Sequence, residues 1–220
     1  MSALVESDVE IAVIDYGMGN RRSVEKALQH VGARARITSD PQALRAAGGL
    51  VLPGVGAFPK AMENLRAQGL DELIRERVAA GTPLLGICLG MQLAFEHSEE
   101  LGGAEGLGLI AGSVRPLRAD GLKLPHIGWN EIELAERDSR LTESLPSRCA
   151  FYHVHSFVAE PAREQDLLAS AVYGSRFVTA VERGSFFGVQ FHPEKSSAAG
   201  LRLLANFARI CIGAPAALAG

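Results

Sequence analysis

The segment Gly86-Ile87-Cys88-Leu89-Gly90-Met91-Gln92 is the part of the sequence best suited to chemistry, because it places a cysteine between two glycines. A short apolar run typical of a strand, 82–87, precedes it, and a run typical of a helix, 91–96, follows. This is the cysteine counterpart of the Gly-x-Ser-x-Gly nucleophile elbow. Glycines tolerate a strained turn, and the positive end of a helix favours a thiolate. A buried structural cysteine in a tight turn is the alternative.

A second segment, Gly188-Val189-Gln190-Phe191-His192-Pro193-Glu194, could supply what such a nucleophile needs. We expect a strand that ends at His192, with Pro193 turning the chain so that Glu194 reaches the imidazole. His192 would deprotonate Cys88 and later protonate a leaving amine, while Glu194 orients the imidazole. Alone, the run would indicate a solvated surface turn. Together with the elbow, it predicts a Cys-His-Glu catalytic triad.

A third segment, Pro53-Gly54-Val55-Gly56, follows another apolar run. Its glycines let backbone N–H groups of Val55 and Gly56 face a ligand. With the N–H group of Leu89 they could form an oxyanion hole for a tetrahedral intermediate. Taken alone, the segment would indicate a plain strand-to-helix turn.

The elements that must position these segments alternate between strand and helix in the first half. Apolar runs at 11–15, 33–38, 49–52 and 83–87 are typical of buried parallel strands. Between them we expect a helix capped by Asn20 and stopped by Gly32, and helices at 41–47, 60–68 and 71–80. From Leu107 the pattern becomes shorter and more polar. Here we predict a strand at 151–157, a hairpin of 177–182 with 186–191, and an amphipathic helix over 196–212.

We therefore predict one α/β domain over 9–213, with a central mixed, mostly parallel sheet flanked by helices. Residues 1–8 would be an N-terminal extension. Residues 214–220 would be a flexible tail, to which we assign no role.

Composition limits the class of protein. The chain has 220 residues, of which 47% are hydrophobic and 21% charged, and a net charge of -3, so nothing announces a nucleic-acid partner. No apolar run approaches the roughly 18 residues of a membrane span, and no signal peptide is evident. Three cysteines without paired spacing fit a reducing cytoplasm. No metal-ligand spacing occurs, and we expect no cofactor.

These motifs carry a family resemblance. The elbow and His192-Pro193-Glu194 resemble the class I, or triad, glutamine amidotransferases, which implies a flavodoxin-like fold. Within that family the chain is similar to the glutaminase subunits of imidazole glycerol phosphate synthases. The runs that carry this narrower likeness are Asp15-Tyr16-Gly17-Met18-Gly19-Asn20, 53–58, Pro125-His126-Ile127-Gly128-Trp129-Asn130, 151–157 and 192–196.

The resemblance implies hydrolysis of glutamine to glutamate and ammonia through a thioester. The ammonia would pass to a separate (β/α)₈-barrel cyclase subunit in a heterodimer. There it would support the synthesis of imidazole glycerol phosphate and aminoimidazole carboxamide ribotide in histidine biosynthesis. The resemblance also implies that the isolated chain is nearly inactive, because partner and ligand must turn an N–H group of the segment 54–56 inward.

Further site residues are implied by the same resemblance. Those at the glutamine pocket are Gly54, Gln92, Glu96, His155, Ser156 and Phe157. Those at or near the cyclase interface are Asn20, Arg22, Trp129, Asn130, Tyr152 and Lys195. Blander interpretations stay open: a helix surface charge for Glu96, a strand histidine for His155, a core aromatic for Trp129 and a solvated lysine for Lys195.

The sequence departs from the family pattern at three positions, and none of them removes a triad member. Arg21 stands where an apolar residue is frequent, His153 where Phe is frequent, and Phe157 where Tyr is common. The last two leave the geometry of the glutamine pocket open. Two rivals remain. One is a hydrolase of the same fold that serves another synthase or acts like a peptidase. The other is a catalytically silent subunit, which should lack a triad residue.

Overall fold

A parallel sheet of five strands forms the centre of the computed structural model, which describes residues 9–213. Its strand order is β2-β1-β3-β4-β13, the order of flavodoxin-like folds. These strands are β1 (Glu10–Ile14), β2 (Arg34–Thr38), β3 (Gly49–Gly54), β4 (Leu84–Cys88) and β13 (Phe186–Val189). In such sheets ligands bind beyond the carboxyl ends of the strands. Both Gly54 and Cys88 lie at that edge.

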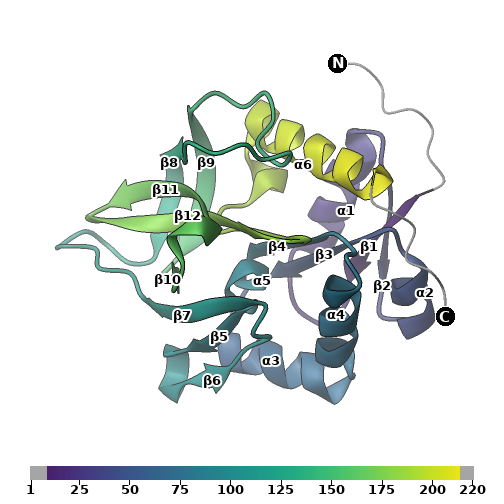
Figure 1. Ribbon diagram of the computed structural model, residues 1–220. Coiled ribbons are helices and arrows are strands. Elements are labelled where there is room, and N and C mark those ends of the chain that lie inside the picture. The colour runs from purple at the N-terminus through teal and green to yellow at the C-terminus, as the bar shows by residue number, and fades with distance from the viewer. Residues whose placement is uncertain (1–8, 214–220) are drawn as a thin grey trace.

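Helices cover both faces of this sheet (Figure 1). They are α1 (Arg21–His30), α2 (Pro41–Ala46), α3 (Phe58–Ala67), α4 (Leu70–Ala79), α5 (Leu89–Gln92) and α6 (Ser197–Ile212). Alternate residues of β1 enter opposite cores: Ile11 and Val13 pack with α1 and α6, whereas Ala12 and Ile14 pack with α2, α3 and α4. This alternation is the period of two that a strand imposes.

The second half of the sheet is largely antiparallel and extends β13 through β12. Its strands are β5 (Phe95–Ser98), β6 (Ala104–Glu105), β7 (Ile110–Pro116), β8 (His126–Leu134), β9 (Arg148–His155), β10 (Phe157–Pro161), β11 (Leu167–Tyr173) and β12 (Ser175–Arg183). Among these described strands, β5 and β7 alone form a parallel pair. The single α/β domain with a mixed sheet is confirmed, with its parallel part concentrated in the first half. Within residues 9–213, single-turn 3-10 helices lie at Glu100–Gly102, Glu164–Asp166 and Pro193–Lys195.

The structure corrects three local predictions. The helix expected over 91–96 is a single turn, α5, and Phe95 and Glu96 belong to β5, which pairs with β7. The strand expected to break at Pro53 continues to Gly54, which pairs with Cys88. The strand expected over 151–157 divides at Ser156 into β9 and β10. The extension 1–8 and the tail 214–220 lie outside the described residues.

Candidate active site

Cys88 adopts the strained backbone that a nucleophile elbow requires. It ends β4 and precedes α5, with φ 55° and ψ −112°, a region that residues other than glycine rarely enter. A conformation of this kind costs about 1–3 kcal/mol and persists only where the surrounding packing enforces it. The sulfur is therefore held in one place at the carboxyl edge of the sheet.

The flanking glycines are needed because neighbouring backbone lies close to them, not because their own backbone is strained. A Cβ atom on Gly90 would lie 1.8 Å from the carbonyl oxygen of Leu52, and one on Gly86 would lie 2.7 Å from that of Gly90. Neither glycine has the positive φ that Cys88 has. Gly90 thus lets the turn pack against β3, and Gly86 lets α5 fold back onto β4.

His192 and Glu194 meet as predicted. Pro193 turns the chain into a short 3-10 helix, and His192 Nδ1 lies 2.9 Å from Glu194 Oε1. The imidazole is 3% exposed, and the Glu194 side chain has no exposed surface. Since the carboxylate oxygen must accept, Nδ1 carries a proton and Nε2 is left for the nucleophile. This is the base-and-orienter arrangement of triad enzymes.

The surroundings of His192 favour the protonated form of its imidazole. Burial alone would lower the pKa of this imidazole, but hydrogen bonds and charge interactions with Cys88 and Glu194 raise it to about 10. The imidazole therefore holds its proton at neutral pH. A protonated imidazole can serve as the acid for a leaving group.

The free edge of β9 is turned toward the triad. Among the described strands β9 pairs with β8 alone, so its other edge can contact the catalytic residues. The carbonyl oxygen of Val154 accepts from Cys88 Sγ at 3.7 Å, and that of Tyr152 accepts from His192 N at 2.9 Å. The buried hydroxyl of Ser196 accepts from Tyr152 N at 3.0 Å and donates to His192 O at 2.6 Å. Sequence reasoning did not assign Ser196 a role, but its hydroxyl links the backbone of β9 to that of His192.

The predicted oxyanion segment lies beside the elbow. Gly54 is opposite Cys88 in the parallel register, and a Cβ atom on it would meet Gly90 N at 2.8 Å. Val55 is exposed, and Gly56 has φ +103°, which favours glycine. Leu89 is the first residue of α5. The structure thus brings all the predicted oxyanion residues to one edge.

The predicted pocket residues on β9, β10 and α5 form one buried group. Gln92 Nε2 donates to Phe157 O at 3.1 Å and to Gln190 Oε1 at 2.9 Å. His155 Nδ1 lies 3.0 Å from the same Phe157 oxygen, and Ser156 forms the bend between the strands. Gln190, to which the sequence analysis assigned no role, is part of this group and donates to Cys88 Sγ at 3.7 Å.

Three buried histidines next to the pocket are held neutral. Because Phe157 O must accept, His155 carries its proton on Nδ1, and its Nε2 accepts from His126 Nδ1 at 3.0 Å. His153 Nε2 lies 2.8 Å from the hydroxyl of Thr179. Burial and neighbouring histidines lower the pKa values of His153 and His155 to about 3, and burial lowers that of His126. These side chains are polar packing rather than bases.

Glu96 contacts the backbone of β7. Its Oε2 accepts from Gly112 N at 2.9 Å, and the side chain is exposed on β5. Another carboxylate lies at the oxyanion segment: Glu100 Oε2 accepts from Phe58 N at 2.8 Å, where α3 begins. Sequence reasoning passed over Glu100. The exposed backbone N–H groups that begin α3 could have suggested a nearby acidic partner.

The predicted interface residues share one region. Trp129 and Tyr152 are register partners in β8 and β9 and contact each other edge to face, and Lys195 Nζ lies 5.9 Å from the Tyr152 ring. Trp129 is 55% exposed, so it is not a core aromatic. The Asn20 side chain does not cap α1 and instead donates to Glu194 Oε1 at 3.3 Å.

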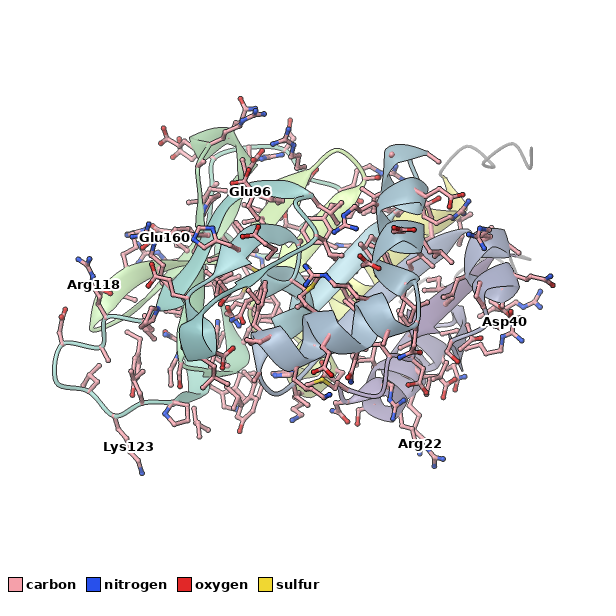
Figure 2. The ribbon with its side chains drawn as sticks, turned by 90° about the horizontal axis from the view of Figure 1, so that it is seen from below. Arg22, Asp40, Glu96, Arg118, Lys123 and Glu160 are labelled. Carbon is pink, nitrogen blue, oxygen red and sulfur yellow. The ribbon has the colours of Figure 1, made fainter. Side chains whose placement is uncertain are left out.

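The remaining interface candidates are Asn130 and Arg22. Asn130 Nδ2 donates to Val172 O at 2.9 Å. Arg22, at the start of α1, projects toward the same side of the molecule as Lys123 of the β7–β8 loop (Figure 2).

The described part of the chain shows neither a metal site nor a membrane-spanning helix. No three histidine, cysteine or acidic side chains within 9–213 are placed to hold a metal ion. No helix in that range is long and apolar enough to span a membrane.

A Cys-His-Glu triad on a flavodoxin-like sheet is the arrangement expected of a glutamine amidotransferase. The chain belongs to the glutamine amidotransferase class-I family, whose model matches residues 12–211. Among curated proteins it is similar to "Imidazole glycerol phosphate synthase subunit HisH" of Moorella thermoacetica, with 49% identity over 91% of this chain and 94% of that protein. The protein of the same description from Symbiobacterium thermophilum is 50% identical over 91% of this chain and 93% of its own length.

Solved structures support the fold. A structure of PurLQS from Thermotoga maritima aligns with a TM-score of 0.74 at 16% identity, covering 93% of this chain and 99% of that one. A crystal structure described as a glutamine amidotransferase aligns with a TM-score of 0.72 at 20% identity, covering 91% and 98%. At these identities the likeness concerns the fold alone.

Proposed function

We propose that the chain is the glutaminase subunit of an imidazole glycerol phosphate synthase and works in the cytoplasm. The observation that carries the proposal is the contact of His192 with both Cys88 and Glu194, in a chain about half identical to HisH proteins over most of its length. In this proposal the product ammonia passes to a (β/α)₈-barrel cyclase subunit. The complex then forms imidazole glycerol phosphate and aminoimidazole carboxamide ribotide for histidine biosynthesis.

The proposed reaction has two stages. The Cys88 thiolate attacks the side-chain amide carbon of glutamine, and backbone N–H groups near Gly56 and Leu89 stabilise the oxyanion. As the C–N bond breaks, His192 gives its proton to the departing ammonia and a thioester remains. His192 then takes a proton from water, whose oxygen attacks the thioester carbon. The C–S bond breaks, giving glutamate and free Cys88.

The face proposed for the cyclase is the outer face of β8 and β9. Strand alternation turns Ile127 and Trp129 outward, and they are 59% and 55% exposed. Tyr152 and Lys195 lie beside them. Exposed aromatic and aliphatic side chains in one patch are typical of a protein interface. Tyr152 also accepts from the backbone of His192, so docking on this face would bear directly on the triad.

The proposal extends to activation by the partner. A turn of the Val55–Gly56 peptide changes ψ of the first residue and φ of the second, and Gly56 allows φ to change at small cost. We expect the isolated chain to hydrolyse glutamine slowly and the complex with cyclase and its ligand to do so much faster. Full turnover by the purified chain alone would refute this part.

One experiment tests the function as a whole. The chain is co-purified with a cyclase subunit and assayed for glutamine-dependent formation of imidazole glycerol phosphate. We expect product with the wild type, and with Cys88→Ala product only when free ammonia is supplied. Ammonia release from glutamine that survives Cys88→Ala would disprove the triad. Activity with a different synthase, and none with the cyclase, would favour the rival glutaminase.

A further inference from the structure

The nucleophile cannot rely on a helix dipole. Helix α5 comprises only four residues, Leu89–Gln92, and the field at a helix terminus arises from many aligned peptide units. Negative charge on Cys88 Sγ therefore needs other partners. His192 is one of them, and the packing around the sulfur provides another.

Gln190 contacts the sulfur from the interior. It follows the end of β13, has no exposed surface, and its Nε2 donates to Cys88 Sγ at 3.7 Å. Its backbone is fixed as well, because Gln190 N donates to Thr179 O at 2.8 Å. The amide is thus a rigid, dry donor, and an N–H group aimed at an anion is most effective in such surroundings.

The hydrogen-bond chain behind Gln190 fixes which end of the amide faces the sulfur. Phe157 O can only accept, so Gln92 must present its nitrogen to it. The same Gln92 nitrogen lies 2.9 Å from Gln190, which must therefore present its oxygen. The other arm of the Gln190 amide, an NH₂ group, remains for Cys88. Reversing the amide would place two donors, or two acceptors, against each other.

Other groups around the sulfur behave differently when it ionises. Val154 O accepts from the thiol and loses this bond in the thiolate. The Tyr16 hydroxyl donates to Pro53 O, and burial and the charge of Cys88 raise its pKa. His192 is charged and backed by Glu194, while the neighbouring His153 and His155 are neutral. Gln190 is an uncharged donor that does not titrate.

We propose that Gln190 is a further catalytic residue, whose Nε2–H group stabilises the negative charge on Cys88 Sγ while Gln92 holds the amide in that orientation. Its importance for turnover rests on the glutaminase function proposed above. Its effect on the sulfur does not, and can be measured without glutamine or partner.

The test is the pH dependence of Cys88 alkylation by iodoacetamide in the full-length chain. Reaction at Cys149 and Cys211 is subtracted with Cys88→Ala. Gln190→Met removes the amide at similar size, and Gln190→Glu keeps the acceptor for Gln92 while removing the donor. Thr179→Val is the matched control, since it removes a buried polar group that contacts His153 and not the sulfur.

We expect Gln190→Met to slow alkylation at neutral pH about tenfold and to move the profile about one pH unit upward, as for loss of a hydrogen bond to a charged group. Gln190→Glu should shift the alkylation profile at least as far, and the profile of Thr179→Val should match that of the wild type. In the complex, kcat should fall while KM for glutamine stays unchanged.

A folded Gln190→Met protein with the wild-type alkylation profile would overturn the proposal. If that variant lacks the wild-type melting transition, the profile of Gln190→Glu decides in the same way. A shifted profile, in a protein whose wild type releases no ammonia from glutamine even in complex with the cyclase and its ligand, would support the role of Gln190 and refute the proposed function.

Discussion

Asn20 donates a hydrogen bond of 3.3 Å to the Glu194 oxygen that also contacts His192, although the two residues are 174 positions apart in the chain. Asn20 occupies the capping position of α1 without capping it. The triad carboxylate is therefore oriented by a side chain from the region proposed for the partner, and the base is positioned from two sides.

The first prediction concerns this contact. Asn20→Ala leaves Glu194 Oε1 with one donor instead of two, so we expect kcat for glutamine hydrolysis in the complex to fall about tenfold. KM for glutamine should change little, because Asn20 contacts the carboxylate and not the pocket. Lys26→Ala, an exposed change on the same helix, is the control. An unchanged kcat in a complex of normal affinity would contradict the prediction.

The second prediction concerns alkaline pH. The pKa of His192 is raised to about 10 by Cys88 and Glu194 against the opposing effect of burial, so the imidazolium persists at neutral pH. It is lost as the pH rises through about 10, and with it the proton for the leaving ammonia. We expect kcat of the complex to decline there rather than near 6.5.

Glu194→Gln should move this alkaline limb to lower pH, because the carboxylate charge is gone. The raised pKa of His192 also stabilises the folded chain. This contribution to the free energy of unfolding is complete below about pH 6.5 and is lost as the pH rises through about 10. Unfolding curves at each pH separate the two effects. A limb that stays in place in Glu194→Gln would show that another group controls it.

The third prediction concerns stability in acid. Burial lowers the pKa of His153 to about 3, so between about 3 and 6.5 the unfolded chain binds a proton that the folded chain excludes. Stability is thus lost as the pH falls through this window, at up to about 1.4 kcal/mol per pH unit for one group.

His153→Phe, combined with Thr179→Val to avoid an unpaired hydroxyl, should flatten this acid dependence relative to Thr179→Val alone. The measurement is urea unfolding at a series of pH values between 4 and 7. Parallel curves for the two proteins would argue against the assignment to His153.

The fourth prediction concerns the elbow glycine. Gly90→Ala would push a methyl group into the carbonyl oxygen of Leu52. That oxygen belongs to the backbone of β3 and cannot move aside cheaply. We expect loss of several kcal/mol of stability and of glutaminase activity, since the turn carries Cys88. Gly81→Ala is a matched control, with positive φ but open space: about 1 kcal/mol of stability should be lost and activity kept. Full activity in Gly90→Ala would mean that the elbow can relax.

Local patterns were informative wherever a residue acts through its immediate neighbours. The apolar runs predicted β1 to β4, because buried parallel strands need continuous apolar residues. His192 and Glu194 could be paired in advance because only a proline separates them. Where long-range pairing overrides local preference, the sequence misled: the helix expected over 91–96 gives way to β5, which pairs with β7.

The sequence alone determined that a cysteine sits in an elbow, that a histidine and a glutamate could serve it, and which family these motifs resemble. Only the tertiary structure decided which side chains surround the sulfur. Gln190, Asn20 and Ser196 lie in segments that the sequence singled out, but the contact that each makes with a distant element could not be read from it. The structure also changes the description of the elbow. Cys88 itself has the strained backbone, and the flanking glycines allow close packing. Neighbouring side chains, rather than the dipole of the helix expected after Cys88, surround the sulfur.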